Sequence, residues 1–368
     1  MKRIFLLSLI TLWSISEAAA QSGRIQTTPT APAEKPTVQV TQDPAEIKKQ
    51  DAVPYSESVP NTRRLVFPSK KKAIKAVQTP PAENSEETIR VETNLVTIPV
   101  AVTDRNNVYM TDLKQEEFKI FENGVEQEVA YFGASEKPFT VVLLIDVSNS
   151  TAYKIEEIQA AAITFVEQLK PQDKVMVIQF DESVKVLEEF TNDREKLKQA
   201  IKRTGFGDNT ALYAALDFSL HKRLTKIEGR KAIVLFTDGV DNYSEKTTFE
   251  GTVRDAEESQ AVVFPIYYNT FSKTRGAKDY SSVERVRGES YLNALADATG
   301  GKLVRPSATP TGLTIAFQSI AEELRRQYSI GYYPSEAGTT GERRQIRVRV
   351  NRPKLSVRAR DSYIVGAQ

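Results

Sequence analysis

The chain has 368 residues, enough for one large domain or two ordinary ones, and its 40% hydrophobic content leaves room for a stretch that does not fold. Its 50 lysines and arginines nearly balance its 48 aspartates and glutamates, so the charge indicates neither a nucleic acid nor an anionic membrane as partner. The absence of cysteine excludes disulfides, thiolate metal sites and cysteine catalysis, and the single histidine, His221, offers little to a serine triad or a polyhistidine site.

The N-terminus has the pattern of a secretory signal peptide. Lys2 and Arg3 precede an apolar run that ends at Ile15, and small residues up to Ala20 follow it. A membrane anchor is the alternative, but the run is shorter than the roughly 20 residues that a span needs. We therefore expect residues 1–20 to be removed and the protein to be exported, periplasmic or extracellular, with no integral membrane span afterwards.

Residues 21–84 are rich in Pro, Thr, Ala, Lys and Gln, and their sparse apolar residues show no period. Such a segment cannot bury enough surface to offset its ordering entropy, so it is predicted to be a disordered linker. Lys70–Lys72 is interpreted as a solvated charge run within it.

Residues 88–136 are predicted to form a small antiparallel β unit. Alternating apolar residues from Val91 to Val102 indicate a strand, and a second apolar run covers residues 118–121. Asn123-Gly124 predicts a hairpin turn after it, with residues 128–132 as the returning strand.

Residues 138–327 show the alternation of a doubly wound α/β domain with a mainly parallel sheet. Continuous apolar runs predict buried strands at residues 140–145, 175–180, 232–236 and 261–267. An antiparallel edge strand is expected at residues 184–187 and a short strand at 303–304. Segments with helical spacing lie between and after the strands, around residues 155–169, 197–201, 212–224, 253–256, 292–296 and 313–324, with Thr311 as a helix cap.

Residues 328–364 contain three further strand candidates, at 328–333, 345–350 and 355–360. A lone hairpin is marginally stable, and the N-terminal β unit also lacks enough strands to stand alone. We therefore expect these segments to pair, which makes the α/β domain an insertion in a small antiparallel, β-sandwich-like module.

Oxygen-bearing side chains follow the predicted parallel strands. The loop after the first strand reads Asp146-Val147-Ser148-Asn149-Ser150, Thr210 precedes the helix at residue 212, and Asp238 follows the strand at 232–236. In doubly wound sheets such loops meet at one edge, where ligands bind. A shell of carboxylate and hydroxyl oxygens suits a hard divalent cation, Mg²⁺ in the first place and Mn²⁺ or Ca²⁺ as alternatives.

Each of these residues also has a purely structural interpretation. Ser148, Ser150 and Thr210 could cap the helices that follow them, and Asp238 could be a turn residue before Gly239. Their joint occurrence at the correct strand ends favours a metal site. Asp208 and Asp241 are interpreted as turn or surface carboxylates, and His221 as a surface histidine rather than a ligand.

The joint pattern resembles the metal-ion-dependent adhesion site of von Willebrand factor type A domains over residues 138–327. The resemblance implies metal ligation, direct or through water, by Asp146, Ser148, Ser150, Thr210 and Asp238, and no enzymatic activity. The hairpin segment 117–124 and the segment Gln327 to Pro334 also resemble a family of secreted bacterial proteins with this domain, common in acidobacteria.

Three functions remain open from the sequence. The favoured one is a non-catalytic, exported adhesion or interaction module whose metal captures an acidic side chain of an unidentified protein partner. The second is a metal-dependent hydrolase, for which no general base or phosphate-binding loop is evident. The third is a structural envelope component without metal-dependent binding. A polar segment from Asn269 to Gly288 is expected to emerge near the metal loops, either to help select the partner or as a disordered insertion.

Overall fold

The computed structural model describes residues 55–59, 95–133, 138–148, 155–268, 282–309 and 311–366, which all lie in one compact unit, Ala45–Gln368. The predicted signal peptide, most of the predicted linker, Ser150 and residues 269–281 lie outside the described residues. None of the helices in the described part is both long and apolar enough to cross a membrane.

A sheet with the strand order β10-β9-β6-β7-β8 forms the centre of the α/β domain. Its strands are β6 (Phe139–Asp146), β7 (Lys174–Phe180), β8 (Val184–Thr191), β9 (Arg230–Thr237) and β10 (Ala261–Tyr267). β6 pairs in parallel with β7 and β9, and β9 pairs in parallel with β10. β8 runs antiparallel to β7 at the edge, as the sequence predicts.

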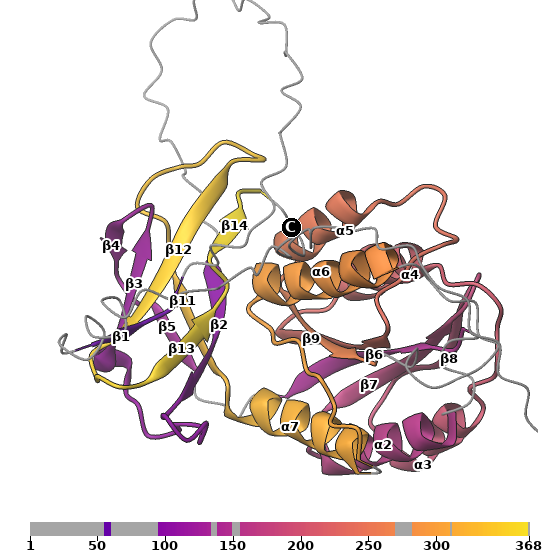
Figure 1. Cartoon of the computed structure of the whole chain (residues 1–368). Helices are drawn as coiled ribbons and strands as arrows, with labels where there is room; N and C mark the ends of the chain where they lie inside the picture. Colours follow the sequence, from indigo (N-terminus) through magenta and orange to yellow (C-terminus); the bar gives the residue numbers. More distant parts are fainter. Residues whose placement is uncertain are drawn as a thin grey trace, which may run out of the picture. The chain divides into compact units, whose positions relative to one another are not determined.

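Helices cover both faces of this sheet (Figure 1). One face carries α2 (Ile155–Gln168), α3 (Arg194–Lys202) and α7 (Gly312–Arg326). The other carries α4 (Leu212–Asp217), its π-helical continuation η3 (Phe218–Leu224), α5 (Phe249–Glu258) and α6 (Ser282–Thr299). Alternate residues of β6 enter the two cores, Leu143 on one side and Leu144 on the other, which is why the strand reads as one apolar run.

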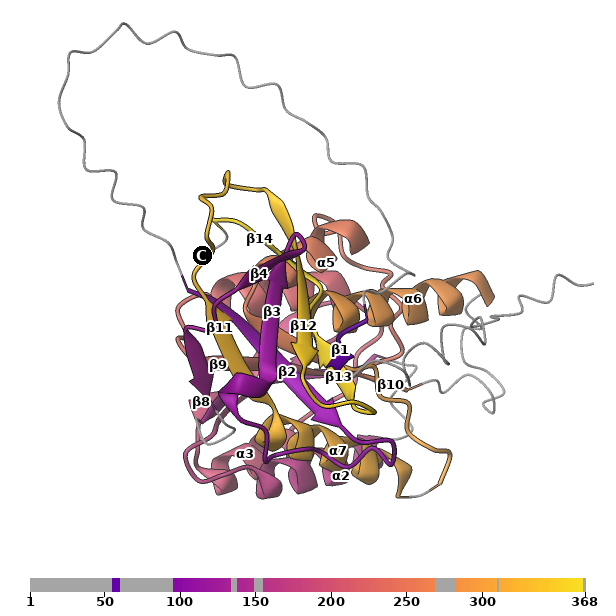
Figure 2. The same cartoon turned by 90° about the vertical axis from the view of Figure 1, so that its left-hand side faces the viewer.

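The β module consists of two antiparallel sheets (Figure 2). One contains β1 (Ser56–Glu57), β12 (Arg343–Val350), β3 (Phe118–Glu122), β4 (Val125–Gln127) and, also on β12, β14 (Ser362–Ile364). The other contains β13 (Ser356–Ala359), β2 (Val96–Thr103), β11 (Tyr328–Tyr332) and β5 (Tyr131–Gly133). A single 3₁₀ turn, η1 (Gln115–Glu117), precedes β3.

The strands before the α/β domain pair directly with those after it. β3 pairs with β12, and β2 pairs with β11 and β13. Their inward side chains, Ile98, Ile120, Ile330 and Val348 among them, share one buried core. The predicted fold class, a doubly wound α/β domain inserted in an antiparallel module, is confirmed.

The predicted returning strand at residues 128–132 of the β module is wrong. The strand after the Asn123-Gly124 turn begins at once with β4, because both turn residues have positive φ (48° and 87°) and close a two-residue hairpin. Residues 131 and 132, expected in that strand, belong to β5, which pairs with β11 in the other sheet. The linker prediction also fails at Ser56–Glu57, which pairs with β12.

Helix ends also differ from the prediction. Thr311 precedes α7 but its hydroxyl makes no capping hydrogen bond. α6 begins at Ser282, so the last residues of the predicted polar segment are helical. The expected strand at residues 303–304 is reduced to one bridge between Ile266 and Val304.

Candidate metal centre

The candidate site lies where the order of the sheet changes direction. From β6 the chain moves to β7 and β8 on one side and then returns to β9 on the other. A crevice outside the carboxyl ends of β6 and β9 is therefore the expected ligand position of a doubly wound sheet. Asp146 is the last residue of β6 and Thr237 the last residue of β9, with Asp238 directly after it.

Asp146 is fully buried and its carboxylate is held at both oxygens. The backbone N–H of Ser148 donates to Oδ1 at 2.9 Å, and the hydroxyl of Thr237 donates to Oδ2 at 2.7 Å. Burial raises the pKa of Asp146 to about 6; hydrogen bonds from Ser148 and Thr237 oppose the shift and the nearby Asp181 carboxylate adds to it. A charged carboxylate in this position would be stabilised by a cation.

The loop that carries Thr210 is fixed to the other two loops by backbone hydrogen bonds. Gly207 N–H donates to the Val147 carbonyl at 2.8 Å. Thr210 N–H donates to Asn242 Oδ1 at 2.8 Å, and Asn242 N–H donates back to the Thr210 carbonyl at 3.0 Å. This reciprocal pair joins the loop before α4 to the loop after β9.

The turn after β9 orients Asp238. Gly239 has φ of +81°, which favours glycine, and its N–H donates to the Thr237 hydroxyl at 3.1 Å. Val240 N–H donates to Asp238 Oδ1 at 3.0 Å. Thr237 therefore connects this turn to Asp146. Its hydroxyl accepts a hydrogen bond from the N–H of Gly239 and donates one to the Asp146 carboxylate.

The N-terminus of α4 is capped from a distant loop. Asp241 Oδ2 accepts from the N–H of Tyr213 at 2.8 Å, and the Ser244 hydroxyl accepts from the N–H of Ala214 at 3.0 Å. The local cap residue, Ala211, supplies no side-chain hydrogen bond. The capping alternative for Thr210 is thus wrong. Asp241 is a turn residue, since its Oδ1 accepts from the N–H of Ser244 at 3.1 Å, and it also caps α4.

Four of the five predicted ligands are described and all are buried. Exposed fractions are 0% for Asp146, 2% for Ser148, 1% for Thr210 and 3% for Asp238. Ser150 falls outside the described residues, and α2 as described begins only at Ile155, well past Ser148. Three residues near the site were not predicted from the sequence: Thr237, Asp181 and Asn242. Only their positions, at the ends of β9 and β7 and after Asp238, could have indicated them.

The set of donors suits a hard cation. Two carboxylates and two hydroxyls supply only oxygen, and Asp146 is a buried carboxyl whose pKa is raised by lack of solvent and by a second carboxylate. Magnesium and calcium prefer such oxygen ligands. The residues present therefore fit a divalent cation.

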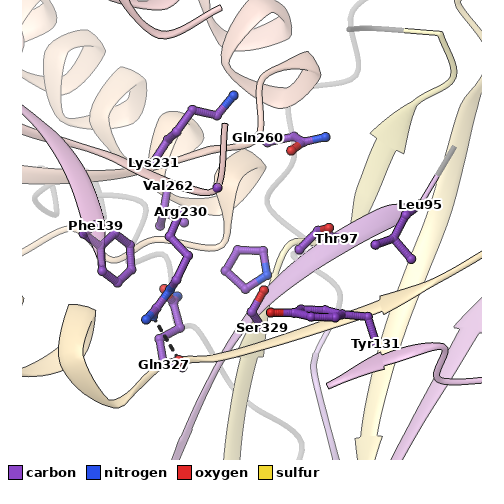
Figure 3. A pocket seen from close by; sticks show the side chains of 12 residues that line it. Leu95, Thr97, Tyr131, Phe139, Arg230, Lys231, Gln260, Val262, Gln327 and Ser329 are labelled. Atoms are coloured by element: carbon purple, nitrogen blue, oxygen red, sulfur yellow. Dashed lines mark hydrogen bonds between the residues drawn. The ribbon is translucent and has the colours of Figure 1, made fainter. Parts of the chain in front are cut away.

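A hollow of about 250 Å³ lies at the amino ends of the parallel strands, and its lining residues differ in charge from those of the candidate site (Figure 3). It lies between the beginnings of β6, β9 and β10 and the outer face of β2 and β11. The Arg230 guanidinium lies over the Phe139 ring at 3.7 Å and donates to the Gln327 carbonyl at 3.0 Å. None of its described lining residues is Asp or Glu, so it does not suit a cation.

Comparison with known proteins identifies the region around the site. Residues 141–240 match the family model for the von Willebrand factor type A domain. This stretch runs from β6 to the turn after β9 and contains Asp146, Ser148, Thr210 and Asp238. A search of curated proteins found no match.

Several solved structures are similar to part of this chain at low sequence identity. An aerotolerance-related membrane protein from Bacteroides fragilis is 19% identical over 51% of this chain and 98% of its own, with a TM-score of 0.40. The vWF domain of the type V pili tip protein Mfa5 from Porphyromonas gingivalis is 15% identical over 50% and 94%, with a TM-score of 0.40. A von Willebrand factor type A protein from Catenulispora acidiphila is 13% identical over 73% and 75%, also with a TM-score of 0.40.

Proposed function

We propose that this chain, in which residues 141–240 match the family model for the von Willebrand factor type A domain, is an exported, non-catalytic interaction module that binds a partner carboxylate through a divalent metal. Mg²⁺ is the proposed ion, with Mn²⁺ or Ca²⁺ as alternatives. The proposed ligands, direct or through water, are Asp146, Ser148, Ser150, Thr210 and Asp238. Export rests on the signal-peptide pattern of residues 1–20.

One observation carries this proposal. Asp146, Thr210 and Asp238 are buried on three loops that are hydrogen-bonded to one another at the carboxyl edge of the sheet. Fixed oxygen donors from separate loops lose little entropy when an ion binds them, and such rigidity is what a small cation with strict geometry requires.

The mixture of hydroxyls and carboxylates supports capture of an acidic partner. Neutral ligands from Ser148 and Thr210 leave much of the charge of a divalent ion uncompensated. A divalent cation held there would supply an open coordination position that a glutamate or aspartate of the partner could fill. A shell made only of aspartates would repel that group.

Exposed aromatic side chains lie beside the same loops. Phe206 is 64% exposed on the loop before Thr210, and Tyr243, whose N–H donates to the Thr210 carbonyl, is 48% exposed. Exposed aromatic residues are common anchors of protein interfaces. A protein partner could thus cover these rings while its carboxylate reaches the metal.

In the part of the chain that the structure describes, the histidine that could serve a hydrolase as its base does not lie at the ends of β6 and β9. His221 lines a hollow together with Gly229 and Ala261, which stand at the beginnings of β9 and β10. It therefore lies toward the amino edge of the sheet, away from the ends of β6 and β9. A general base must reach the reacting group within hydrogen-bonding distance, which this position does not allow.

Calorimetric titration with Mg²⁺ and Mn²⁺ tests the site. Asp146→Asn keeps the size of the side chain and removes its charge, so we expect the affinity for the metal to fall on the order of 100-fold. Loss of a residue that only supports the metal ligands typically lowers affinity by about 10- to 100-fold. Asp208→Asn is the matched control, because Asp208 is an exposed carboxylate on the Thr210 loop. Equal binding by the wild type and Asp146→Asn would refute the proposed site.

Metal affinity should also depend on pH. Because the pKa of Asp146 is raised to about 6, protons compete with the metal below that pH, and Mg²⁺ affinity should fall by up to about 10-fold per pH unit there. In the metal-free protein the charged form of the Asp146 carboxyl lowers the stability of the fold. The pKa of Asp146 in the folded protein lies above its ordinary value of 3.8, so charging the carboxyl costs stability as pH rises from about 4 to 6.

Titrations between pH 5 and pH 8 measure this dependence (roughly one unit below and two above the pKa). The residual affinity of Asp146→Asn should vary less across the range than that of the wild type. A wild-type affinity that stays constant down to pH 5 would contradict a role for this carboxylate in binding the ion.

A further inference from the structure

A second group of side chains of the kinds that bind metals lies on the helices at the other end of the sheet. His221 on η3 is the only histidine of the chain, and its Nδ1 is 2.9 Å from Oδ1 of Asp217, one turn earlier. Asp255 on α5 completes the group. One ligand atom from each of Asp217, His221 and Asp255 lies within 4.8 Å of the other two.

Two packed helices supply the side chains of this group at helical spacings. Asp217 and His221 are four residues apart on α4 and η3, and Asp255 and Glu258 are three residues apart on α5. Residues at these spacings lie side by side on a helix surface. Pairs of side chains from facing helices are the usual source of metal sites in helical bundles.

The group opens into a hollow of about 480 Å³. His221, Asp255 and Glu258 line it together with the apolar side chains Leu224 and Ile227. An ion held by the three side chains would therefore border a space large enough for water or a small ligand. Hollows with a few convergent polar groups are the usual form of binding sites.

The carboxylates of the group repel one another, and the cationic side chains near them are Arg254 and, at the hollow, Lys231. Burial raises the pKa of Asp255, an effect that Asp217 increases and that His221 and Arg254 oppose. Burial likewise raises the pKa of Glu258, with Asp255 adding to it. The Arg254 guanidinium reaches Glu258 only at 3.9 Å and is 64% exposed, so a bound cation would relieve the repulsion more effectively.

The backbone that carries His221 is unusual. Residues Phe218–Leu224 form a π-helix, and the Thr225 hydroxyl donates to the carbonyls of Leu220 and His221 at 3.0 and 3.1 Å where it ends. π-helical turns are rare and are frequently found at functional sites. This feature is independent of the side-chain cluster and lies at the same place.

We propose that Asp217, His221 and Asp255 bind a transition-metal dication such as Zn²⁺ or Ni²⁺. Imidazole together with carboxylates suits these ions, whereas the all-oxygen shell at the ends of β6 and β9 suits Mg²⁺ or Ca²⁺. The domain thus carries two cation sites of different chemistry at opposite edges of its sheet.

The single histidine makes the test direct. In the untagged chain purified after export, ¹H–¹⁵N NMR of the imidazole gives one set of signals, all from His221. Titration with Zn²⁺ should shift them and reach saturation at one equivalent. His221→Ala and Asp255→Asn should each weaken Zn²⁺ binding, followed by calorimetry, by at least about 10-fold.

Two variants serve as controls. Glu250→Gln removes an exposed carboxylate from the same helix, α5, and should leave Zn²⁺ binding unchanged. Asp146→Asn should also leave it unchanged, which separates this site from the proposed Mg²⁺ site. Unmoved imidazole signals would mean that Asp217 and His221 form only an ion pair, and equal affinity of Asp255→Asn and wild type would show that α5 contributes no ligand; either result overturns the proposal.

Discussion

Replacement of Arg344 by methionine should lower the free energy of unfolding by about 3–5 kcal/mol, the cost typical of breaking a buried ion pair. Arg344 and Glu122 are each 5% exposed, and Nη1 of the arginine lies 2.6 Å from Oε1 of the glutamate. The methionine would leave the carboxylate buried without its cation. Urea denaturation followed by circular dichroism measures the difference.

The Glu122 carboxylate is the centre of a wider network. Its Oε2 accepts hydrogen bonds from the hydroxyls of Tyr332 and, at 3.0 Å, Tyr363. Burial and the nearby carboxylate raise the pKa of Tyr363 to about 12, so it remains a donor at neutral pH. Strands that precede and follow the inserted domain, 222 residues apart at Glu122 and Arg344, are thus held by one polar cluster.

Arg347 on the same strand provides the matched control. Its side chain is 47% exposed and lies 3.9 Å from Glu57, so Arg347→Met should cost less than about 1 kcal/mol. The double variant Glu122→Gln with Arg344→Met should recover part of the lost stability, because neither charge then remains buried alone. Equal costs for Arg344→Met and Arg347→Met would contradict the buried pair.

The sequence predicts those parts of the fold that depend on regular hydrophobic patterns. β6 is apolar along its length because both faces are covered, and β12 alternates because only one face meets the core. β1 could not be predicted in this way. Its two residues are held by pairing with β12, by Glu57 near Arg349 at 3.2 Å and by the Tyr55 ring under the Arg349 guanidinium at 3.8 Å, and all of these contacts join distant parts of the chain.

The candidate site, like the fold, could be predicted from the sequence only where a local pattern marks its residues. Asp146 and Asp238 are recognisable because Asp146 ends the apolar run of β6 and Asp238 directly follows β9. Thr237 and Asn242 act through hydrogen bonds to residues at positions 146 and 210, and no local pattern reveals such bonds. The capping role of Asp241 could not be predicted for the same reason, since the helix that it caps begins 29 residues earlier at Leu212.

Gly239→Ala should destabilise the domain and weaken metal binding together. The residue has φ of +81°, which costs an alanine about 1–2 kcal/mol. An added Cβ would also lie 2.6 Å from the Gly288 carbonyl oxygen on α6, and such overlap with backbone typically costs a further 1–3 kcal/mol or so. We expect a total loss of about 2–5 kcal/mol in urea denaturation.

Gly229→Ala separates the two causes. Gly229 has nearly the same φ, +83°, but an added Cβ would meet no atom within 4 Å, so only the conformational cost should remain. Gly288→Ala offers the reciprocal case. In a helix interior this change normally adds up to about 1 kcal/mol of stability, yet here the new Cβ would lie 2.8 Å from the Gly239 carbonyl carbon and should destabilise.

Metal binding by Gly239→Ala shows whether the substitution disturbs the metal site itself or only the stability of the domain. Gly239 N–H bonds to Thr237, and the Thr237 hydroxyl bonds to Asp146, so displacement of the turn should misplace the buried carboxylate. Mg²⁺ affinity should therefore fall in Gly239→Ala and stay unchanged in Gly229→Ala, although both variants carry strained backbone. If both bound Mg²⁺ as the wild type does, the close approach of α6 to this turn would have no part in holding the site.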